Sequence, residues 1–342
     1  MPSAWTVSPI FWLPLGALVS FLLTFRLFNL PMVSDEGGYA YAADRWFSGR
    51  GELYHDIWIS RPQAIFVIYG FVIKTLGGST VDFRIVAWLF GVVTMVVVGK
   101  LVSLWSGPRV AAGATMIFAL LIGSPAIEGF TANAEAFMAL PAALSVLTLW
   151  IALQRGWTMR WLVLTGALIG LATQLKPSAI SMLAVALGFV ALMIHEDESF
   201  RKTVAARTLA ICAGFGLSLG PALYHGYRIG WDAFVYAAAG YRVAHQSSAT
   251  NSLQHHISAI ELLSARLWPA YIVVGLIVIG RITTEPGRIA LSSPQMRPQP
   301  VLGIVSRPTR LRSDDPAWRL LQLWLVGCLI GIAMGGDWWY DY

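Results

Sequence analysis

Charged residues are scarce in this chain of 342 residues, since Asp, Glu, Lys and Arg together make up only 12% of it. A soluble domain carries about 25%. The hydrophobic share of 56% also excludes an intrinsically disordered chain, because disorder requires low hydrophobicity and high charge. The net charge of +6 does not indicate a nucleic-acid partner, since the basic residues lie in loops between apolar runs. The composition predicts an all-α polytopic membrane protein.

Cysteine is nearly absent as well. Cys212 and Cys328 both lie inside apolar runs, where a free cysteine behaves as a small core residue. Two such residues exclude a disulfide scaffold and a cysteine-based zinc site. The first apolar run also lacks a preceding basic segment and an Ala-x-Ala site, so we expect a spanning helix there and not a cleaved signal peptide.

Apolar runs that can cross a bilayer, which takes about 20 residues, recur along the whole chain. We expect about nine spans, at 10–30, 83–105, 109–127, 134–153, 161–176, 177–194, 204–223, 267–280 and 319–335.

The apolar run 64–76 is shorter, at 13 residues, and runs of this length are more often interfacial than spanning. If it stays out of the bilayer, most Lys and Arg residues fall on one side, including the Arg-rich segment 281–318. Positive residues accumulate on the cytoplasmic side. We therefore expect a cytoplasmic N-terminus in the plasma (inner) membrane. The resulting division is one transmembrane domain over 1–342, with outer loops at 31–82 and 224–266 and a cytoplasmic basic linker at 281–318.

The first outer loop carries an acidic pair, Asp35-Glu36, at the start of a predicted short helix. Ser34 or Asp35 can cap this helix, which we expect to run to about Ser48 and to end at Gly49. Asp35 lies where the helix dipole favours a carboxylate, and Glu36 points elsewhere because adjacent residues do not share a face. An apolar face at helical spacing is expected to lie on the membrane. It consists of Tyr39, Ala42, Ala43, Trp46 and Phe47.

Arg61 follows in the same loop, next to Pro62 and close after Tyr54-His55-Asp56. Two interpretations are open for Arg61. Its guanidinium can hold a lipid phosphate, or it can be an interfacial arginine that extends its charge into water.

The order of these motifs resembles the GT-C glycosyltransferases. The resemblance consists of the early outward Asp35-Glu36 pair, then Tyr39, Gly51-x-x-Tyr-x-Asp56, a basic-Pro step and a short apolar helix. The nearest branch looks like the protein O-mannosyltransferases and the lipid A aminoarabinose transferases, which use polyprenyl-phosphate-linked sugars. Relatives usually continue beyond the point where this chain ends, so the sequence is either a short member or a fragment.

The resemblance implies a GT-C-type helical bundle with interfacial helices in the first outer loop. It implies a catalytic role for Asp35 and Glu36, and a donor or acceptor role for residues matching the family's other motifs. These are Tyr39, His55, Arg61, Glu135, Lys176, Asp337 and Trp338. No cofactor is assigned, and assistance by a divalent metal is left open.

Several of these residues have plainer explanations. Glu128 and Glu135 can be interfacial acids, Lys176 can neutralise a helix end, and most Trp residues can belong to an interfacial belt. Trp338 beside Asp337 can stack on a sugar. The pair His255-His256 supplies too few ligands for a metal site.

The function expected from these observations is transfer of a sugar from a polyprenyl-phosphate donor to a hydroxyl of a lipid, glycan or protein. The reaction would take place at the outer face of the bilayer, with inversion. The alternative is a transporter or flippase of a lipid-linked or small polar substrate. Transporters usually place ionisable residues near the bilayer midplane, whereas here the charges cluster at helix ends.

Overall fold

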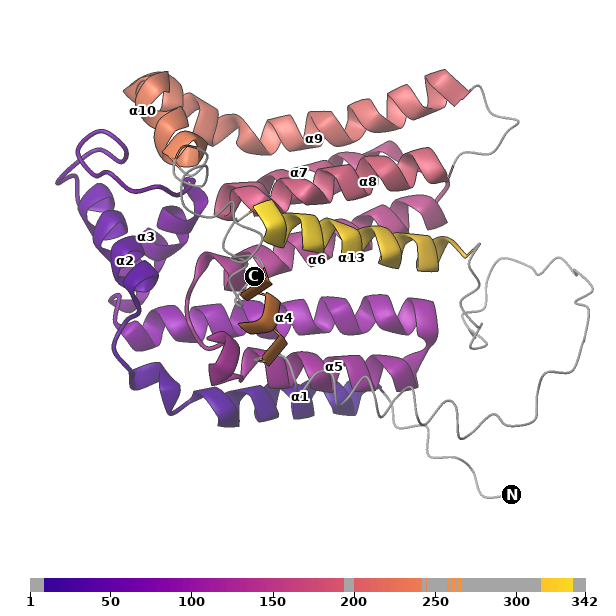
Figure 1. The fold of residues 1–342 in the computed structure, drawn as a ribbon, viewed down its shortest axis with the longest axis horizontal. Coiled ribbons are helices and arrows are strands. Elements are labelled where there is room, and N and C mark those ends of the chain that lie inside the picture. Colours follow the sequence, from indigo (N-terminus) through magenta and orange to yellow (C-terminus); the bar gives the residue numbers. More distant parts are fainter. Residues whose placement is uncertain are drawn as a thin grey trace, which may run out of the picture.

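The computed structural model describes residues 9–193, 200–241 and 315–334, residue 244, and a few residues between 257 and 265. Long helices run side by side through this part of the chain (Figure 1). They are α1 (Pro9–Thr24), α4 (Thr80–Ser106), α5 (Pro108–Ile122), α6 (Ala134–Gln154), α7 (Met159–Leu175), α8 (Ser181–Leu192), α9 (Phe200–Ile229) and α13 (Pro316–Met334).

The shorter elements gather mainly at one end of this bundle, on the left in Figure 1. We call it the site end. The short elements are η1 (Leu27–Asn29), α2 (Ser34–Phe47), α3 (Ala64–Leu76), η2 (Pro125–Ile127), η3 (Pro177–Ile180), α10 (Trp231–Val235) and the π-helical turn η4 (Tyr236–Gly240).

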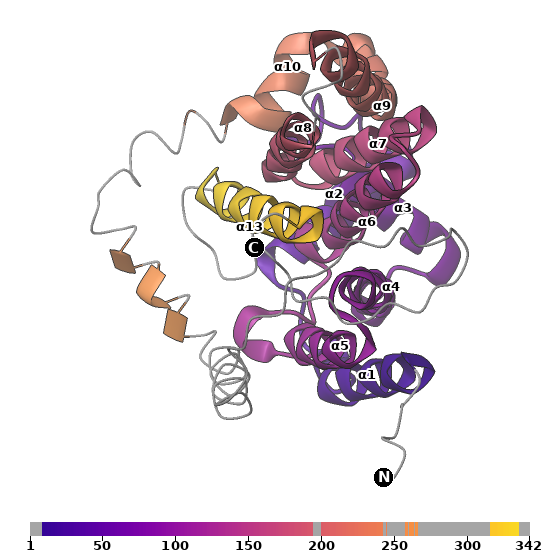
Figure 2. The same cartoon turned by 90° about the vertical axis from the view of Figure 1, so that its right-hand side faces the viewer.

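Seen from the opposite end, the long helices form a stack from α1 through α5, α4, α6 and α7 to α9, with α8 and α13 beside it (Figure 2). Chain direction alternates from one long helix to the next between α1 and α9, and α13 runs in the same direction as α9. As a result α4 and α6 begin at the site end, while α5, α7 and α9 finish there (Figure 1).

Eight of the nine expected spans coincide with helices of the described residues, and the ninth, 267–280, lies outside them. Within the described part of the chain, four helical stretches are long and apolar enough to cross a membrane. The protein is therefore an integral membrane protein, and the count of nine stays a prediction. The four stretches are Thr80–Ser106, Ala134–Gln154, Lys202–Ile229 and Pro316–Ala333.

Helix α3 has the bounds expected for the short apolar run, 64–76, and it lies with α2 at the site end, at an angle to the long helices (Figure 1). Gly77 and Gly78 end it with φ angles of 107° and 78°, which only glycine adopts readily. Ser79 then caps α4, because its hydroxyl accepts from the amide of Asp82 and its own amide donates to the Asp82 carboxylate. This turn separates α3 from the spanning helix that follows.

Helix α2 differs from expectation at its start and on its apolar face. Its N-cap is Val33, so neither Ser34 nor Asp35 caps it. Tyr39, Ala42 and Ala43 are buried, but they pack on α3 and its neighbours and not on lipid. Tyr39 meets the rings of Phe66 and Tyr69 edge-on. The first loop therefore folds as a small protein core, because α3 offers its face an apolar partner.

Close approach of α7 and α9 depends on glycine. A Cβ atom at Gly166 would overlap the carbonyl oxygen of Ile211, and one at Gly214 would overlap that of Val163. The motif Gly166-x-x-x-Gly170 therefore makes the helix contact that small-xxx-small pairs permit. By contrast, no other atom lies close to Gly216 or Gly220, so the similar spacing there does not mark a contact.

Gly166→Ala is expected to lower the thermal unfolding temperature. Overpacking typically costs about 1–3 kcal/mol, and here the clash is with backbone that cannot turn aside. The matched control is Gly216→Ala, which meets no atom and should be neutral or stabilise its helix by up to about 1 kcal/mol. Unfolding in lipid nanodiscs, followed by tryptophan fluorescence, measures both. Equal melting of the two variants would contradict the packing described.

Candidate active site

A buried ion pair joins α2 to α4 at the site end. Glu36 is 1% exposed and Arg84 is 0% exposed. The guanidinium donates twice to the carboxylate, from Nε to Oε1 at 3.0 Å and from Nη2 to Oε2 at 2.7 Å. Two parallel bonds of this kind are the strongest form of a charge-assisted hydrogen bond.

Both partners of this ion pair also form hydrogen bonds with backbone groups. Arg84 donates to the carbonyl oxygens of Leu27, Leu30 and Pro31, which carry the chain from α1 to α2. Glu36 accepts from the amide of Ala132 at 2.7 Å and from that of Val33 at 3.0 Å. One ion pair therefore fixes the start of α2, the end of α1 and the segment before α6. Arg84 was not foreseen from the sequence, although a charged residue within a spanning helix is itself a functional signal.

Asp35, the neighbour of Glu36, faces a different set of groups. Its Oδ2 accepts from the hydroxyl of Tyr39 at 3.0 Å and from Nη2 of Arg61 at 2.5 Å. Nε of Arg61 in turn donates to the Tyr39 hydroxyl at 2.8 Å. Asp35, Tyr39 and Arg61 thus form a closed triangle of hydrogen bonds, which we call the acidic triangle. The structure brings together three residues that the sequence singled out.

The acidic triangle leaves one carboxylate oxygen open. Both hydrogen bonds to Asp35 fall on Oδ2, and no described residue donates to Oδ1. The side chain is 45% exposed. Burial raises the pKa of Tyr39 well above its ordinary value, so its phenol stays protonated and donates. Asp35 is therefore held in a fixed orientation with a free basic atom.

The backbone of Arg61 is fixed by a hydrogen bond from Tyr54. The Tyr54 hydroxyl donates to the carbonyl oxygen of Arg61 at 2.8 Å. The backbone of Tyr54 has a positive φ of 73°. Burial raises the pKa of the Tyr54 phenol above its usual range, so that this donor too is permanent. The loop 51–63 is shaped around this contact.

His55 lies apart from the acidic triangle. Its exposed ring contacts the carboxylate of Asp56 at 2.8 Å. A hydrogen bond from the backbone amide of Glu52 and the contact with His55 both lower the pKa of Asp56. Asp56 of the Gly51-x-x-Tyr-x-Asp56 motif therefore stabilises the turn in which it lies. Tyr54 is the residue of this motif that contacts the acidic triangle, through Arg61.

Glu135 and Lys176 form a second ion pair at the site end, and both side chains are largely buried. Glu135 lies in the first turn of α6 and Lys176 follows the last residue of α7. The bond from Ala132 to Glu36 ties this region to α2. Pairing of these two residues was not foreseen from the sequence, because they are 41 positions apart and no local pattern connects them.

Asp337 and Trp338 lie outside the described residues, as do His255 and His256. Glu128 lies after η2 with a left-handed φ of 52°. Within the described ranges, no group of three or more His, Cys, Asp or Glu side chains is placed to hold a metal ion.

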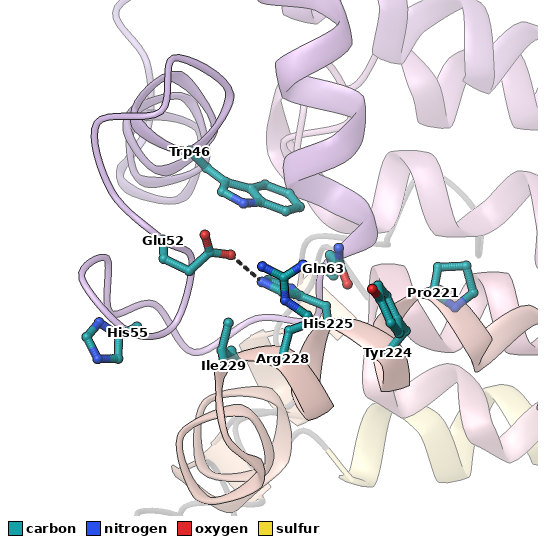
Figure 3. A pocket seen from close by; sticks show the side chains of 9 residues that line it. All are labelled: Trp46, Glu52, His55, Gln63, Pro221, Tyr224, His225, Arg228 and Ile229. Atoms are coloured by element: carbon teal, nitrogen blue, oxygen red, sulfur yellow. Dashed lines mark hydrogen bonds and ion pairs between the residues drawn. The ribbon is translucent and has the colours of Figure 1, made fainter.

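A cavity of about 540 Å³ opens at the site end between the C-terminal part of α2, the loop after it and the end of α9 (Figure 3). Trp46, Glu52, Gln63 and His225 line it together with Tyr224 and Arg228. His225 stacks on Trp46 with ring centroids 5.3 Å apart, and its Nε2 lies 2.8 Å from Glu52 Oε1. None of α9's contributions was foreseen from the sequence, since that helix was expected to end at 223.

Comparison with known proteins finds one matching family model. Residues 60–219 match the family model described as dolichyl-phosphate-mannose-protein mannosyltransferase. No curated protein matches the chain in sequence.

Two solved structures of the oligosaccharyltransferase of Archaeoglobus fulgidus share the fold. The apo form has a TM-score of 0.51 at 15% identity, over 84% of this chain and 41% of the archaeal chain. The complex with Zn and sulfate has a TM-score of 0.50 at 16% identity, over 80% and 40%. This chain thus spans about two fifths of their length. The resemblance to GT-C glycosyltransferases seen in the sequence is confirmed.

Glu36→Gln is expected to destabilise the fold strongly. It leaves the Arg84 guanidinium buried without a counter-charge, and breaking a buried pair in this way costs about 3–5 kcal/mol. Glu52→Gln is the matched control, since Glu52 is half exposed and its contact with His225 should contribute less than about 1 kcal/mol. Chemical unfolding in mixed micelles compares the two. A Glu36→Gln protein as stable as Glu52→Gln would show that the pair does not organise the site end.

Proposed function

We propose that this protein is a membrane glycosyltransferase that moves a sugar from a polyprenyl-phosphate-linked donor to a hydroxyl group. The matched family supports the chemical class of the donor. The observation that carries the proposal is the acidic triangle, in which Asp35 is oriented through Oδ2 while Oδ1 stays open. Fixing a base in its productive geometry is the main way in which a site accelerates proton transfer.

In the proposed reaction, Asp35 Oδ1 takes the proton of the acceptor hydroxyl. The hydroxyl oxygen bonds to the anomeric carbon from the face opposite the phosphate. The bond between that carbon and the phosphate oxygen breaks, and the electron pair leaves with the polyprenyl phosphate. Attack from the opposite face inverts the anomeric centre. A phosphate departs with little protonation, so cations should matter more than a general acid.

Arg61 can contribute to the phosphate site without leaving Asp35. A guanidinium has five N–H groups, and Arg61 commits three, to Tyr39, Asp35 and the carbonyl oxygen of Ser60. One N–H on each terminal nitrogen remains for the phosphate. Arg61 would then place the base and the leaving group relative to each other. Lys176 is proposed as a second cation, whose charge Glu135 balances before the donor binds.

Of the other proposed site residues, Tyr39 orients Asp35, and Glu36 is reassigned from catalysis to positioning because it is buried and fully bonded. His55 is proposed to meet the acceptor at the loop surface. Asp337 and Trp338 stay proposed sugar contacts. The donor's lipid chain would lie in the bilayer along the helices.

The proposed orientation is a cytoplasmic N-terminus with the site end outward, in the plasma membrane. Basic residues at the opposite end of the bundle support it, because positive loops stay inside. They include Arg109, Arg155, Arg160 and Lys202. The loops 31–82 and 224–266 would then be external and the linker 281–318 internal, within one GT-C-like domain.

Asp35→Asn is expected to lower sugar transfer by about 10²- to 10⁴-fold, which is the usual effect of removing a general base. The amide keeps the size and can accept from Tyr39 and Arg61, so the fold should survive. Donor binding should persist, because cations hold the phosphate. The measurement is transfer from a polyprenyl-phosphate sugar by the purified protein, with thermal unfolding as the folding control. A folded Asp35→Asn protein with wild-type turnover would contradict the assignment and favour a transporter.

Arg61→Ala should reduce kcat/KM more than Arg61→Lys. An ammonium keeps the attraction to phosphate but lacks the planar fork that bonds Asp35 and Tyr39 in fixed directions while other N–H groups face the phosphate. A charge-assisted contact contributes about 1.5–3 kcal/mol, so Ala should lower kcat/KM by about 10- to 150-fold. Arg50→Ala is the control, because Arg50 is exposed and pairs with Asp44 at the surface. If Arg61→Ala has the same kcat/KM as Arg50→Ala, Arg61 is an interfacial arginine that does not bind the donor phosphate.

A further inference from the structure

We propose that the cavity between α2 and α9 binds a sugar unit of an extended glycan acceptor, away from the hydroxyl that reacts. The identification of its occupant as the acceptor rests on the proposed function, whereas the affinity for a sugar follows from the cavity itself. The walls come from segments far apart in the sequence, with Trp46 on α2, Gln63 before α3 and His225 on α9 (Figure 3).

Two polar atoms in this wall have no protein partner among the described residues. One is Oε1 of Gln63 and the other is Nδ1 of His225, a side chain that is more than nine-tenths buried. Glu52 is an acceptor, so Nε2 of His225 carries a hydrogen and donates it to Glu52, while the carbonyl oxygen of Gln63 can only accept. Leaving such atoms unbonded costs about 1–3 kcal/mol each. A ligand that donates a hydrogen bond can satisfy Gln63 Oε1, which in this structure is buried in the wall.

An acceptor of this kind favours hydroxyl groups over a phosphate. A phosphate diester carries no donor, whereas each sugar hydroxyl donates one hydrogen bond and accepts others. The remaining wall matches a neutral polyol, because Glu52 accepts while Arg228 donates, and the two charges balance. Tyr224 is 63% exposed and offers an aromatic ring on which an apolar sugar face can pack.

The position of the cavity sets the length of the occupant. Gln63 is two residues from Arg61 of the acidic triangle, but Trp46 is 11 residues from Asp35 on the same helix. At 1.5 Å per residue, Trp46 lies about 16 Å from Asp35 along α2. An acceptor that reaches Asp35 and fills the cavity is therefore longer than one sugar. The structure favours an oligosaccharide or a glycolipid head group over a small alcohol.

The test is direct binding, independent of catalysis. Saturation-transfer NMR on the protein in lipid nanodiscs would be recorded with a panel of methyl hexosides and pentosides at millimolar concentrations. We expect at least one glycoside to bind, and Gln63→Leu and His225→Phe each to weaken it. Loss of one neutral hydrogen bond corresponds to about a 2- to 12-fold change in Kd. Both variants keep the volume of the wall, and His225→Phe also keeps a ring against Trp46.

The matched control is Gln154→Leu, the same replacement at an exposed position at the opposite end of the bundle. It should bind the glycoside as the wild type does, and thermal unfolding should show all variants folded. Inorganic phosphate should not displace the glycoside. Binding by no glycoside, equal binding by Gln63→Leu, or displacement by phosphate would each overturn the proposal.

Asp35→Asn separates this inference from the proposed function. It should lower transfer by about 10²- to 10⁴-fold and leave glycoside binding unchanged, because Asp35 does not line the cavity. Glycoside binding together with undiminished transfer by Asp35→Asn would refute the catalytic assignment alone. Loss of transfer by Asp35→Asn with no glycoside binding to the wild type would refute the cavity proposal alone.

Discussion

The site end depends on one buried contact, the ion pair of Glu36 with Arg84. In an apolar bundle an arginine is tolerated only when its charge and its donors are matched, and here Glu36 and three backbone carbonyls meet that need. The same carboxylate binds Val33 and Ala132. The hydrogen bonds that neutralise the buried Arg84 thus connect the end of α1, the start of α2, the start of α4 and the segment before α6.

With the start of α2 fixed, the adjacent carboxylate acquires its own direction. Glu36 points into the bundle, so Asp35 one residue earlier turns toward Tyr39 and Arg61. The pair of acids that looks redundant in the sequence therefore divides into one that holds the helix and one that is free to react. The burial of Tyr39, which raises its pKa, keeps a neutral donor beside Asp35.

The sequence was sufficient for the coarse architecture, because apolar run length and loop charge report directly on a bilayer. The bounds of α3 followed from the length of its apolar run. Prediction was weaker where two helices meet. The four-residue spacing of Gly216 and Gly220 is typical of a helix contact, yet Gly214 makes the contact with α7, since the rotation of α9 against α7 decides which glycine faces its neighbour.

The sequence by itself determined that the chain enters a membrane and that the acidic pair opens the first loop. These properties are local, since each is set by composition or by residues a few positions apart. Tertiary structure alone decided that Arg84 pairs with Glu36, that Lys176 pairs with Glu135, and that His225 completes a cavity with Trp46. Such contacts join helices distant in the chain, and only the packing of the bundle selects which side chains meet.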